Sequence, residues 1–215
     1  MLTYQQIYVT TYNLAQWANW SRIMYSLVQS QFSMSNNLDL SSSITHMVIL
    51  SQSLCFLETL HCALNLTKGS AVTSFSQFIG RNAVLFGFVV PLQQTNVAVF
   101  YMYLAWAISE VIRYPFYAFS TLKMDFFPIV YLRYTTFIVL YPIGVMSELS
   151  VLYQAFPIAT ADPRYWMFGG YIKFIMLPYM IYAYGVAFPQ IFRYLLKTRK
   201  QALSPTTTTI NKKDK

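Results

Sequence analysis

Long apolar stretches separated by short polar segments dominate this sequence. Six stretches are long enough to cross a bilayer as helices, which takes about 20 largely apolar residues. The connections between them are short, and we find no internal repeat. The pattern predicts an all-α membrane protein, a six-transmembrane-helix bundle. The predicted helices are residues 7–29, 44–66, 71–91, 95–119, 128–153 and 167–194.

The chain divides into one six-span membrane domain, residues 1–200, and a flexible tail, residues 201–215. The first predicted helix is the least apolar, because Gln16, Asn19 and Arg22 interrupt it. The first twenty residues also lack the basic region and the cleavage site of a signal peptide. We therefore expect membrane insertion to rely on the first helix itself.

Composition agrees with a lipid environment. Hydrophobic residues make up 56% of the chain and charged residues only 10%, whereas soluble domains average about 25% charged residues. The net charge is +8, and seven of the fifteen basic residues lie between Arg193 and Lys215. Because the 18% aromatic residues fall in apolar runs, we interpret the basic end as a cytosolic tail beside anionic lipid, and we expect no nucleic-acid partner.

The charges of the connecting segments predict the orientation. Lys68, Lys123 and the basic tail follow alternate helices, while the other set of connections holds Asp39 and the pair Asp162 and Arg164. Cytosolic connections are the ones enriched in Lys and Arg. We therefore expect both termini to be cytosolic.

The last four residues carry a candidate localisation signal. Lys212 and Lys213 stand at the fourth and third positions from the end of this sequence, as in a dilysine retrieval signal of the endoplasmic reticulum. Such a signal is an address read by a receptor and works only in the cytosol, which agrees with the predicted orientation. The alternative is a tail of lysines that only aids solubility.

Ionisable side chains interrupt the predicted helices. In a membrane such residues are costly and by default face the bundle interior. Glu58 and His61 are three residues apart and share a helix face, as do Glu110 and Arg113. A hydrogen-bonded structural pair explains the first two, and mutual neutralisation explains the second two. Arg81 lies in the third helix.

Glu148 follows an uncharged stretch of the fifth helix, whose cytosolic end carries Arg133, a candidate membrane anchor. No basic residue stands three or four positions from Glu148, so it needs a partner from another helix or must be held neutral by apolar surroundings. Tyr141 precedes it by two turns, about 10 Å along the axis, on nearly the same face. We expect Pro142 to bend the helix, so that a small molecule fits between the two side chains.

Four blocks of the chain resemble the very-long-chain (3R)-3-hydroxyacyl-CoA dehydratases, also labelled protein tyrosine phosphatase-like proteins. Together the blocks are specific, and the resemblance spans all six predicted helices. The blocks are LETLHCALNLTKGS (57–70), LAWAISEVIRYPFYAF (104–119), LRYTTFIVLYPIGVMSEL (132–149) and FPQIFRYLLKTRK (188–200).

The resemblance implies a six-span enzyme of the endoplasmic reticulum membrane with cytosolic termini and no cofactor. It implies the third step of fatty acid elongation, in which a 3-hydroxyacyl-CoA loses water and becomes a trans-2-enoyl-CoA. The family's catalytic tyrosine and glutamate fall on Tyr141 and Glu148. The expected partners are the acyl-CoA substrate, membrane lipid and the other elongation enzymes, namely the ketoacyl-CoA synthase, ketoacyl-CoA reductase and enoyl-CoA reductase.

Dehydration needs one group to take a proton from C2 and another to protonate the departing hydroxyl. The residues leave this assignment open, although the weak basicity of a phenol favours Glu148 as proton acceptor. A donor for the thioester oxygen would come from Arg113, Tyr114 or a backbone N–H. Supporting or substrate-binding roles remain for the other ionisable residues, which are Glu110, His61, Glu58, Arg81 and Arg133.

The CoA head group is anionic and is expected to stay at the cytosolic face. Candidate phosphate partners are Lys68, Lys123, Arg133 and the cluster 193–200. The alternative for each is a signal for topology beside lipid head groups.

Phosphatase activity and a zinc site are both excluded by the cysteines. A cysteine phosphatase needs Cys-x5-Arg, but Cys62 has Lys68 at the sixth position. The positions of Cys55, His46 and His61 do not match the Cys/His ligand spacing of a zinc site. Two cysteines are too few for a disulfide framework. We expect both cysteines to serve in packing.

Two other classes of function are alternatives. One is a catalytically idle scaffold of the elongation complex, which would tolerate loss of Tyr141 or Glu148. The other is a small transporter lined by the ionisable residues of the second and fourth helices, but such folds show inverted repeats or matched broken helices, and we find neither.

Overall fold

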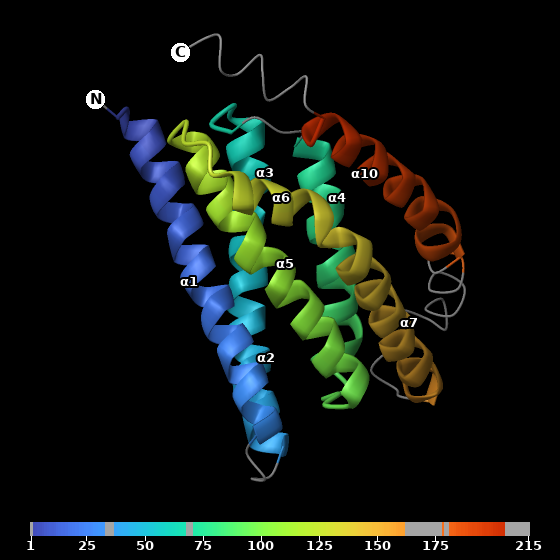
Figure 1. Ribbon diagram of the computed structural model, residues 1–215. Helices are drawn as coiled ribbons and strands as arrows, with labels where there is room; N and C mark the ends of the chain where they lie inside the picture. Colours follow the sequence, from blue (N-terminus) through green and yellow to red (C-terminus); the bar gives the residue numbers. More distant parts are fainter. Residues whose placement is uncertain (1, 33–36, 68–70, 162–177, 179–180, 205–215) are drawn as a thin grey trace.

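The computed structural model describes residues 2–32, 37–67, 71–161, 178 and 181–204. Regular structure within these ranges is entirely helical (Figure 1), which confirms the predicted all-α class. The helices are α1 (Tyr4–Phe32), α2 (Asn37–Leu54), α3 (Phe56–Ala63), α4 (Ala71–Val84), α5 (Val97–Thr121), α6 (Phe127–Thr135), α7 (Phe137–Ala161) and α10 (Phe188–Ala202), with two π-helical turns, η1 (Leu85–Val89) and η2 (Ile181–Ala187).

Several helices follow one another almost without interruption. Only Cys55 separates α2 from α3, and only Thr136 separates α6 from α7, while η1 continues α4 and η2 leads into α10. The described chain thus forms six helical segments: α1, α2–α3, α4–η1, α5, α6–α7 and η2–α10. Their order matches that of the six predicted helices, but most of residues 167–180 of the last prediction lie outside the described residues.

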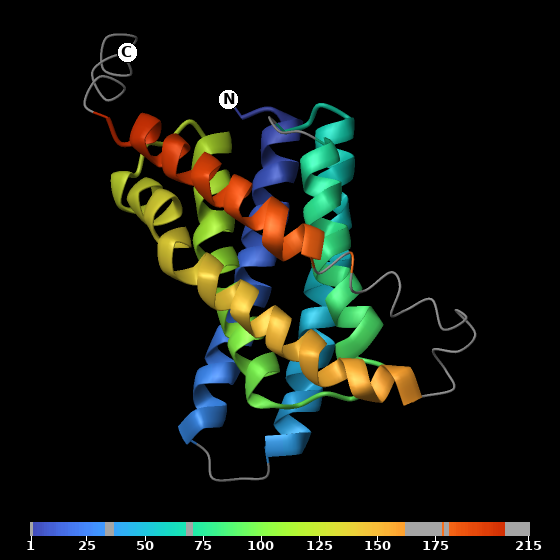
Figure 2. The ribbon, with the colours of Figure 1, turned by 90° about the vertical axis from the view of Figure 1, so that its right-hand side faces the viewer.

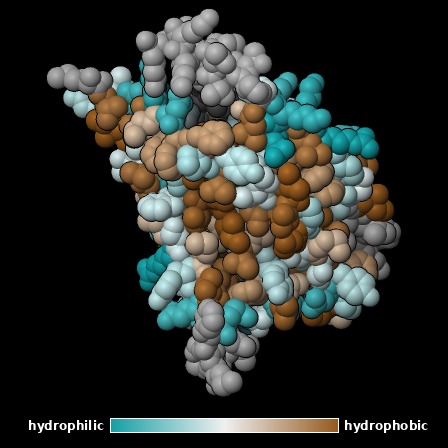
Figure 3. All heavy atoms as spheres, viewed as in Figure 1, coloured by the Kyte–Doolittle hydropathy of each residue, from teal (hydrophilic) through white to brown (hydrophobic). Residues whose placement is uncertain are grey.

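Three stretches of the described chain are long and apolar enough to cross a membrane: Ser42–Ala63, Val97–Thr121 and Phe137–Ala161. They coincide with the second, fourth and fifth predicted helices. Figure 3 shows apolar side chains spread across the middle of the visible face, with more hydrophilic residues towards the ends. Large apolar residues are exposed on several helices, among them Val139 and Met146 of α7. An exposed apolar surface of this kind suits contact with lipid.

Helix α5 lies at the centre of the bundle, between α1 and α7 (Figure 1). Its side chains Met102, Tyr103 and Tyr114 are almost completely buried. Against α7 the packing uses small residues, because a Cβ atom at Gly144 would lie 3.8 Å from the Cβ of Ala105. Small residues allow helices of membrane proteins to approach closely.

The polar residues that weaken the first predicted helix differ in exposure: Gln16 is buried, Asn19 is half-buried and Arg22 is exposed. Gln16 is only 1% exposed, and its amide donates to the Tyr114 hydroxyl of α5 at 3.2 Å. α1 is consequently one unbroken helix of 29 residues. Its polar residues lower the hydropathy of this segment without interrupting the helix.

The start of α1 and the end of α10 lie at the same end of the bundle in both views (Figures 1 and 2). Side chains tie further segments to this end. Gln5 donates to the Leu66 carbonyl at 2.9 Å, and Gln6 donates to the Thr121 carbonyl at 3.2 Å. The turns that follow α3 and α5 therefore lie beside the first residues of the chain.

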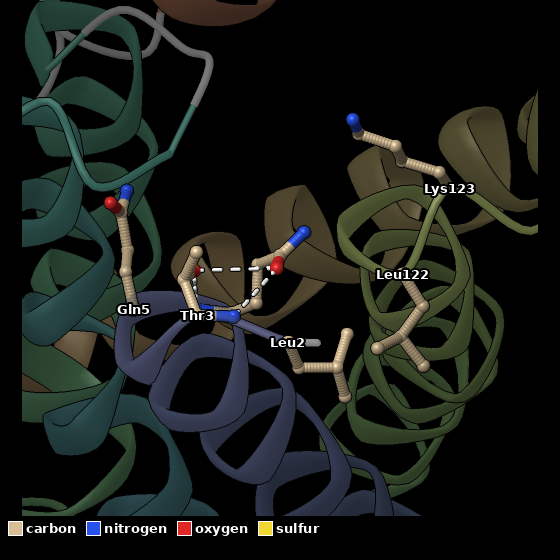
Figure 4. A pocket seen from close by; sticks show the side chains of 6 residues that line it. Leu2, Thr3, Gln5, Leu122 and Lys123 are labelled. Carbon is tan, nitrogen blue, oxygen red and sulfur yellow. Dashed lines mark hydrogen bonds between the residues drawn. The ribbon is translucent and has the colours of Figure 1, made fainter.

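A shallow depression marks this end of the bundle (Figure 4). The start of α1 and the turn after α5 form it, and the Lys123 side chain extends along its rim. Lys123 belongs to the group of basic residues whose positions predict the cytosolic face. The residues that line the depression are Leu2, Thr3, Gln5, Gln6, Leu122 and Lys123.

Candidate active site

Glu148 is a half-buried carboxylate that receives a hydrogen bond on each of its oxygens. The indole N–H of Trp106, on α5, donates to Oε1 at 2.9 Å. The hydroxyl of Tyr184, in η2, donates to Oε2 at 3.0 Å. The requirement for partners from other helices is thereby met. Both partners are neutral donors rather than cations.

Sequence reasoning missed both of these partners. Trp106 stands four residues before Glu110 and therefore shares a helix face with it. Because Glu110 is a candidate site residue, this spacing is a signal that identifies Trp106 as a possible neighbour of the site. Tyr184 is one of eighteen tyrosines, and nothing in the spacing of its neighbours distinguishes it.

Tyr141 is held through its ring. Phe188 of α10 stacks on it with ring centres 5.0 Å apart and planes 19° apart, and Phe192 lies parallel at 6.4 Å. Among the described residues, no side chain or backbone group bonds to the Tyr141 hydroxyl. The ring is thus fixed while its hydroxyl has no partner within the described part of the chain.

The two candidate catalytic residues face the same neighbouring segment. Tyr184 bonds Glu148, and Phe188, one turn later, stacks on Tyr141. Segment η2–α10 therefore runs antiparallel to α7, as Figure 2 also shows. Tyr141 and Glu148 do not bond to each other. α7 continues as one helix through Pro142, and the pairing with η2–α10 places both side chains on one side of it.

A cluster of two arginines and two glutamates lies beside this pair. Arg113 forms two bonds to Glu58, at 2.8 and 2.9 Å, and a third to Glu110 at 2.5 Å. Glu110 also pairs with Arg81. The Tyr114 hydroxyl donates to Glu58 at 2.5 Å. Three elements, α3, α4 and α5, thus contribute charges that sum to zero, which is the arrangement that makes buried charge tolerable.

The predicted neutralisation of Glu110 by Arg113 is confirmed and extends to Glu58 and Arg81. The predicted pair of Glu58 with His61 is wrong, because Glu58 is taken by Arg113 and the His61 ring lies 3.0 Å from the Tyr8 hydroxyl. Sharing a helix face did not lead to a bond, because Glu58 bonds Arg113 of α5 and His61 bonds Tyr8 of α1 instead.

Arg133 and the proposed oxyanion donors differ in their surroundings. Arg133 is half-buried at the end of α6 and forms no ion pair within the described residues. Tyr114 is completely buried, and its hydroxyl is surrounded by Glu58, Gln16 and Arg113. The geometry supports a structural role for Arg113 and Tyr114. Their contact with substrate stays a prediction.

The charged cluster reaches Glu148 through one aromatic ring. The Arg81 guanidinium lies 5.3 Å from the centre of the Trp106 ring, within the range of a cation–π interaction. Trp106 therefore connects the Arg81–Glu110 ion pair on one side to the Glu148 carboxylate on the other.

The chain is similar to known proteins over most of its length. A family model described as "Protein tyrosine phosphatase-like protein, PTPLA" matches residues 52–205. The chain is 30% identical over 209 residues to the chicken (Gallus gallus) very-long-chain (3R)-3-hydroxyacyl-CoA dehydratase, covering 92% of this chain and 58% of the relative. No solved structure matches the chain.

Two further relatives carry the same description. The human (Homo sapiens) very-long-chain (3R)-3-hydroxyacyl-CoA dehydratase 2 is 32% identical over 209 residues, with 93% of this chain and 82% of the relative covered. The rice protein of that description, PASTICCINO 2A (Oryza sativa subsp. japonica), is 28% identical over 212 residues, with 93% and 94% covered. The matched region contains Trp106, Tyr141, Glu148 and Tyr184.

Proposed function

Because the chain belongs to the protein tyrosine phosphatase-like protein family, PTPLA, we propose that it is a very-long-chain (3R)-3-hydroxyacyl-CoA dehydratase. It converts a 3-hydroxyacyl-CoA into a trans-2-enoyl-CoA and water, the third step of fatty acid elongation. One observation carries the proposal beyond the names of the relatives. Helix α7 presents Tyr141 and Glu148 on one side, and η2–α10 contacts both.

Glu148 acts as the proton acceptor in this proposal. It takes the proton from C2 of the substrate, and the electron pair of that C–H bond forms the C2=C3 double bond. The C3–O bond breaks, and the departing hydroxyl leaves as water with a proton from the Tyr141 hydroxyl. The released water then returns the proton from Glu148 to the Tyr141 phenolate. Both Glu148 oxygens accept hydrogen bonds, which is the pattern of an ionised carboxylate, the form that can take a proton.

The substrate lies along η2–α10 in this proposal. The acyl chain occupies the apolar space between helices, and the CoA phosphates stay at the end of the bundle where α1 begins and α10 ends. Helix α10 leads from Phe188, beside Tyr141, to that end and carries the basic residues Arg193, Lys197, Arg199 and Lys200. Lys68, Lys123 and Arg133 are further candidates for contact with phosphate.

The proposed location is the membrane of the endoplasmic reticulum, with six spans and both termini cytosolic. The charge distribution and the common end of α1 and α10 support this topology. Lys212 and Lys213, the proposed retrieval signal, lie outside the described residues. The other enzymes of the elongation cycle are the proposed partners.

Dehydration of a long-chain (3R)-3-hydroxyacyl-CoA by the purified protein in detergent tests the proposal. Glu148→Gln and Tyr141→Phe should each lower kcat by about 100- to 10,000-fold, the usual contribution of a general acid or base. Tyr153→Phe is the matched control, because Tyr153 is on the same helix and 79% exposed. Its turnover should equal that of the parent.

The outcomes separate the candidate functions. Equal turnover by the parent and Glu148→Gln would keep the dehydratase but remove Glu148 from its chemistry. A folded parent without turnover, over a series of chain lengths, would instead support the scaffold.

A further inference from the structure

We propose that Trp106 and Tyr184 are positioning residues that hold the Glu148 carboxylate and decide which of its oxygens receives the substrate proton. The inference rests on the proposed function. It assigns Oε1 to orientation and Oε2 to proton transfer.

Trp106 commits Oε1 to the role of acceptor. An indole N–H donates a hydrogen bond and accepts none, so the bond of 2.9 Å to Oε1 exists only while that oxygen offers a lone pair. Protonation of Oε1 would weaken it as an acceptor. The Trp106 side chain is only 3% exposed, so its N–H has no water to turn to.

The surroundings of Trp106 keep the indole in place. The Arg81 guanidinium lies over its ring, and Glu110 holds that guanidinium through an ion pair. A cation on the ring face also makes the indole N–H more positive and therefore a stronger donor. The charged cluster thus contributes to the orientation of Glu148 without touching it.

Tyr184 behaves differently from Trp106, because a phenolic hydroxyl both donates and accepts. It donates to the ionised Oε2 at 3.0 Å. When the C2–H bond breaks and its proton reaches Oε2, the Tyr184 hydroxyl rotates and its oxygen accepts from the new O–H. The bond to Tyr184 is kept when Oε2 takes the proton, whereas a proton on Oε1 would weaken the bond from Trp106. Oε2 is therefore the oxygen that takes the proton.

Trp106→Phe tests the first half of the inference, since it keeps an aromatic ring under Arg81 and removes the N–H. We expect kcat to fall about 10- to 100-fold, the range for a lost hydrogen bond to a charged group. KM should change less than about twofold, because the carboxylate contributes to the transition state rather than to substrate binding. Tyr103→Phe is the matched control: Tyr103 is one turn earlier on α5, buried, and bonds Thr45 instead.

Tyr184→Phe tests the proposed role of Tyr184 at Oε2. It also keeps the inference testable if the Trp106→Phe variant does not fold. Its kcat should fall about tenfold, while Tyr182→Phe, in the same π-helical turn but 65% exposed, should match the parent. In a Glu148→Gln background neither Trp106→Phe nor Tyr184→Phe should lower the residual rate further. Full activity of both variants, or the same loss with and without Glu148, would overturn the inference.

Infrared spectroscopy tests whether Trp106 and Tyr184 hold the Glu148 carboxylate, and it needs no turnover. Absence of turnover in the parent would count against the proposed function alone. The difference between the parent and Glu148→Gln identifies the carboxyl band of Glu148. That band should shift in Trp106→Phe and in Tyr184→Phe and stay in place in Tyr103→Phe. A band that moves in neither variant would show that the two residues do not hold the carboxylate.

Discussion

Arg113 bonds two carboxylates that come from different helices, Glu58 of α3 and Glu110 of α5. Its planar guanidinium offers donors in a fixed fork, which suits a two-point bond to Glu58 together with a third bond to Glu110. A lysine in the same place is a single point charge and cannot make both sets of bonds. Removing the arginine would leave two carboxylates with only Arg81 to balance them.

Arg113→Ala should therefore destabilise the protein by about 3–5 kcal/mol, the usual cost of breaking a buried ion pair from one side. Arg113→Lys should fall between this variant and the parent. Unfolding of the purified protein in a graded series of sodium dodecyl sulfate concentrations measures the difference.

Arg133→Ala is the control for these variants, since Arg133 forms no ion pair within the described residues. Its stability should stay within about 0.5 kcal/mol of the parent. An Arg113→Lys variant as stable as the parent would show that charge alone, without the forked bonds, maintains the cluster.

At the residue scale, sequence spacing predicts part of the pairing among the ionisable side chains. Spacing along a helix compares a residue only with its own helix, so it found that Glu110 faces Arg113 but not that Arg113 faces Glu58. The same restriction hid Trp106 and Tyr184 from Glu148. Bonds between helices depend on packing that spacing does not describe.

Helix α10 differs from the helix that the sequence predicts. The predicted span ends at residue 194, but α10 runs from Phe188 to Ala202 and begins with a proline in its first turn. Phe188 and Phe192 lie against α7. The ring centres of Phe192 and Phe137 are 5.8 Å apart. The hydropathy pattern detects the apolar part of this segment. It misses the basic last turns, which continue as a helix with apolar residues on one side only.

Phe188→Ala tests how much the α7–α10 contact contributes to Tyr141. An aromatic pair adds about 0.5–1.5 kcal/mol beyond area burial, so we expect kcat to fall about 3- to 10-fold as the Tyr141 ring loses its fixed orientation. The initial rate of enoyl-CoA formation, followed by ultraviolet absorbance, measures this.

Ile191→Ala, on the same helix and 44% exposed, should leave that rate unchanged. If Phe188→Ala were equally active, the stacking would serve helix packing alone, and α10 would have no part in orienting Tyr141.

For the whole molecule, the sequence predicts the order of six helical segments and the grouping of their ends. The turn that carries Lys123 lies beside the start of α1, in agreement with the predicted grouping. The alternation of helices and short connections predicts this grouping, because the chain reverses direction after each segment. It says nothing about how the helices pack, which explains why α5 as the central helix was not anticipated.

Labelling of sealed microsomes with a membrane-impermeant maleimide tests the proposed orientation. Lys123→Cys should react from outside, where the cytosolic face is exposed. Gln93→Cys, in the turn between η1 and α5, should react only after detergent opens the vesicles. Both side chains are exposed, so a difference in labelling reports sidedness.

The parent protein gives the background of Cys55 and Cys62, which are buried and half-buried. The reverse labelling pattern would place both termini in the lumen and remove the cytosolic location of the CoA head group.

The ion pair of Arg81 with Glu110 also has a consequence for the biogenesis of the protein. On the proposed topology α4 enters the membrane before α5 has left the ribosome, and an unpaired arginine at the centre of a helix raises the cost of insertion by about 2.5–3.5 kcal/mol. Pairing with Glu110 offsets this cost, so α4 gains stability in lipid once the nascent chain supplies α5. A chain without Glu110 would be degraded as an unassembled precursor rather than accumulate as a slow enzyme.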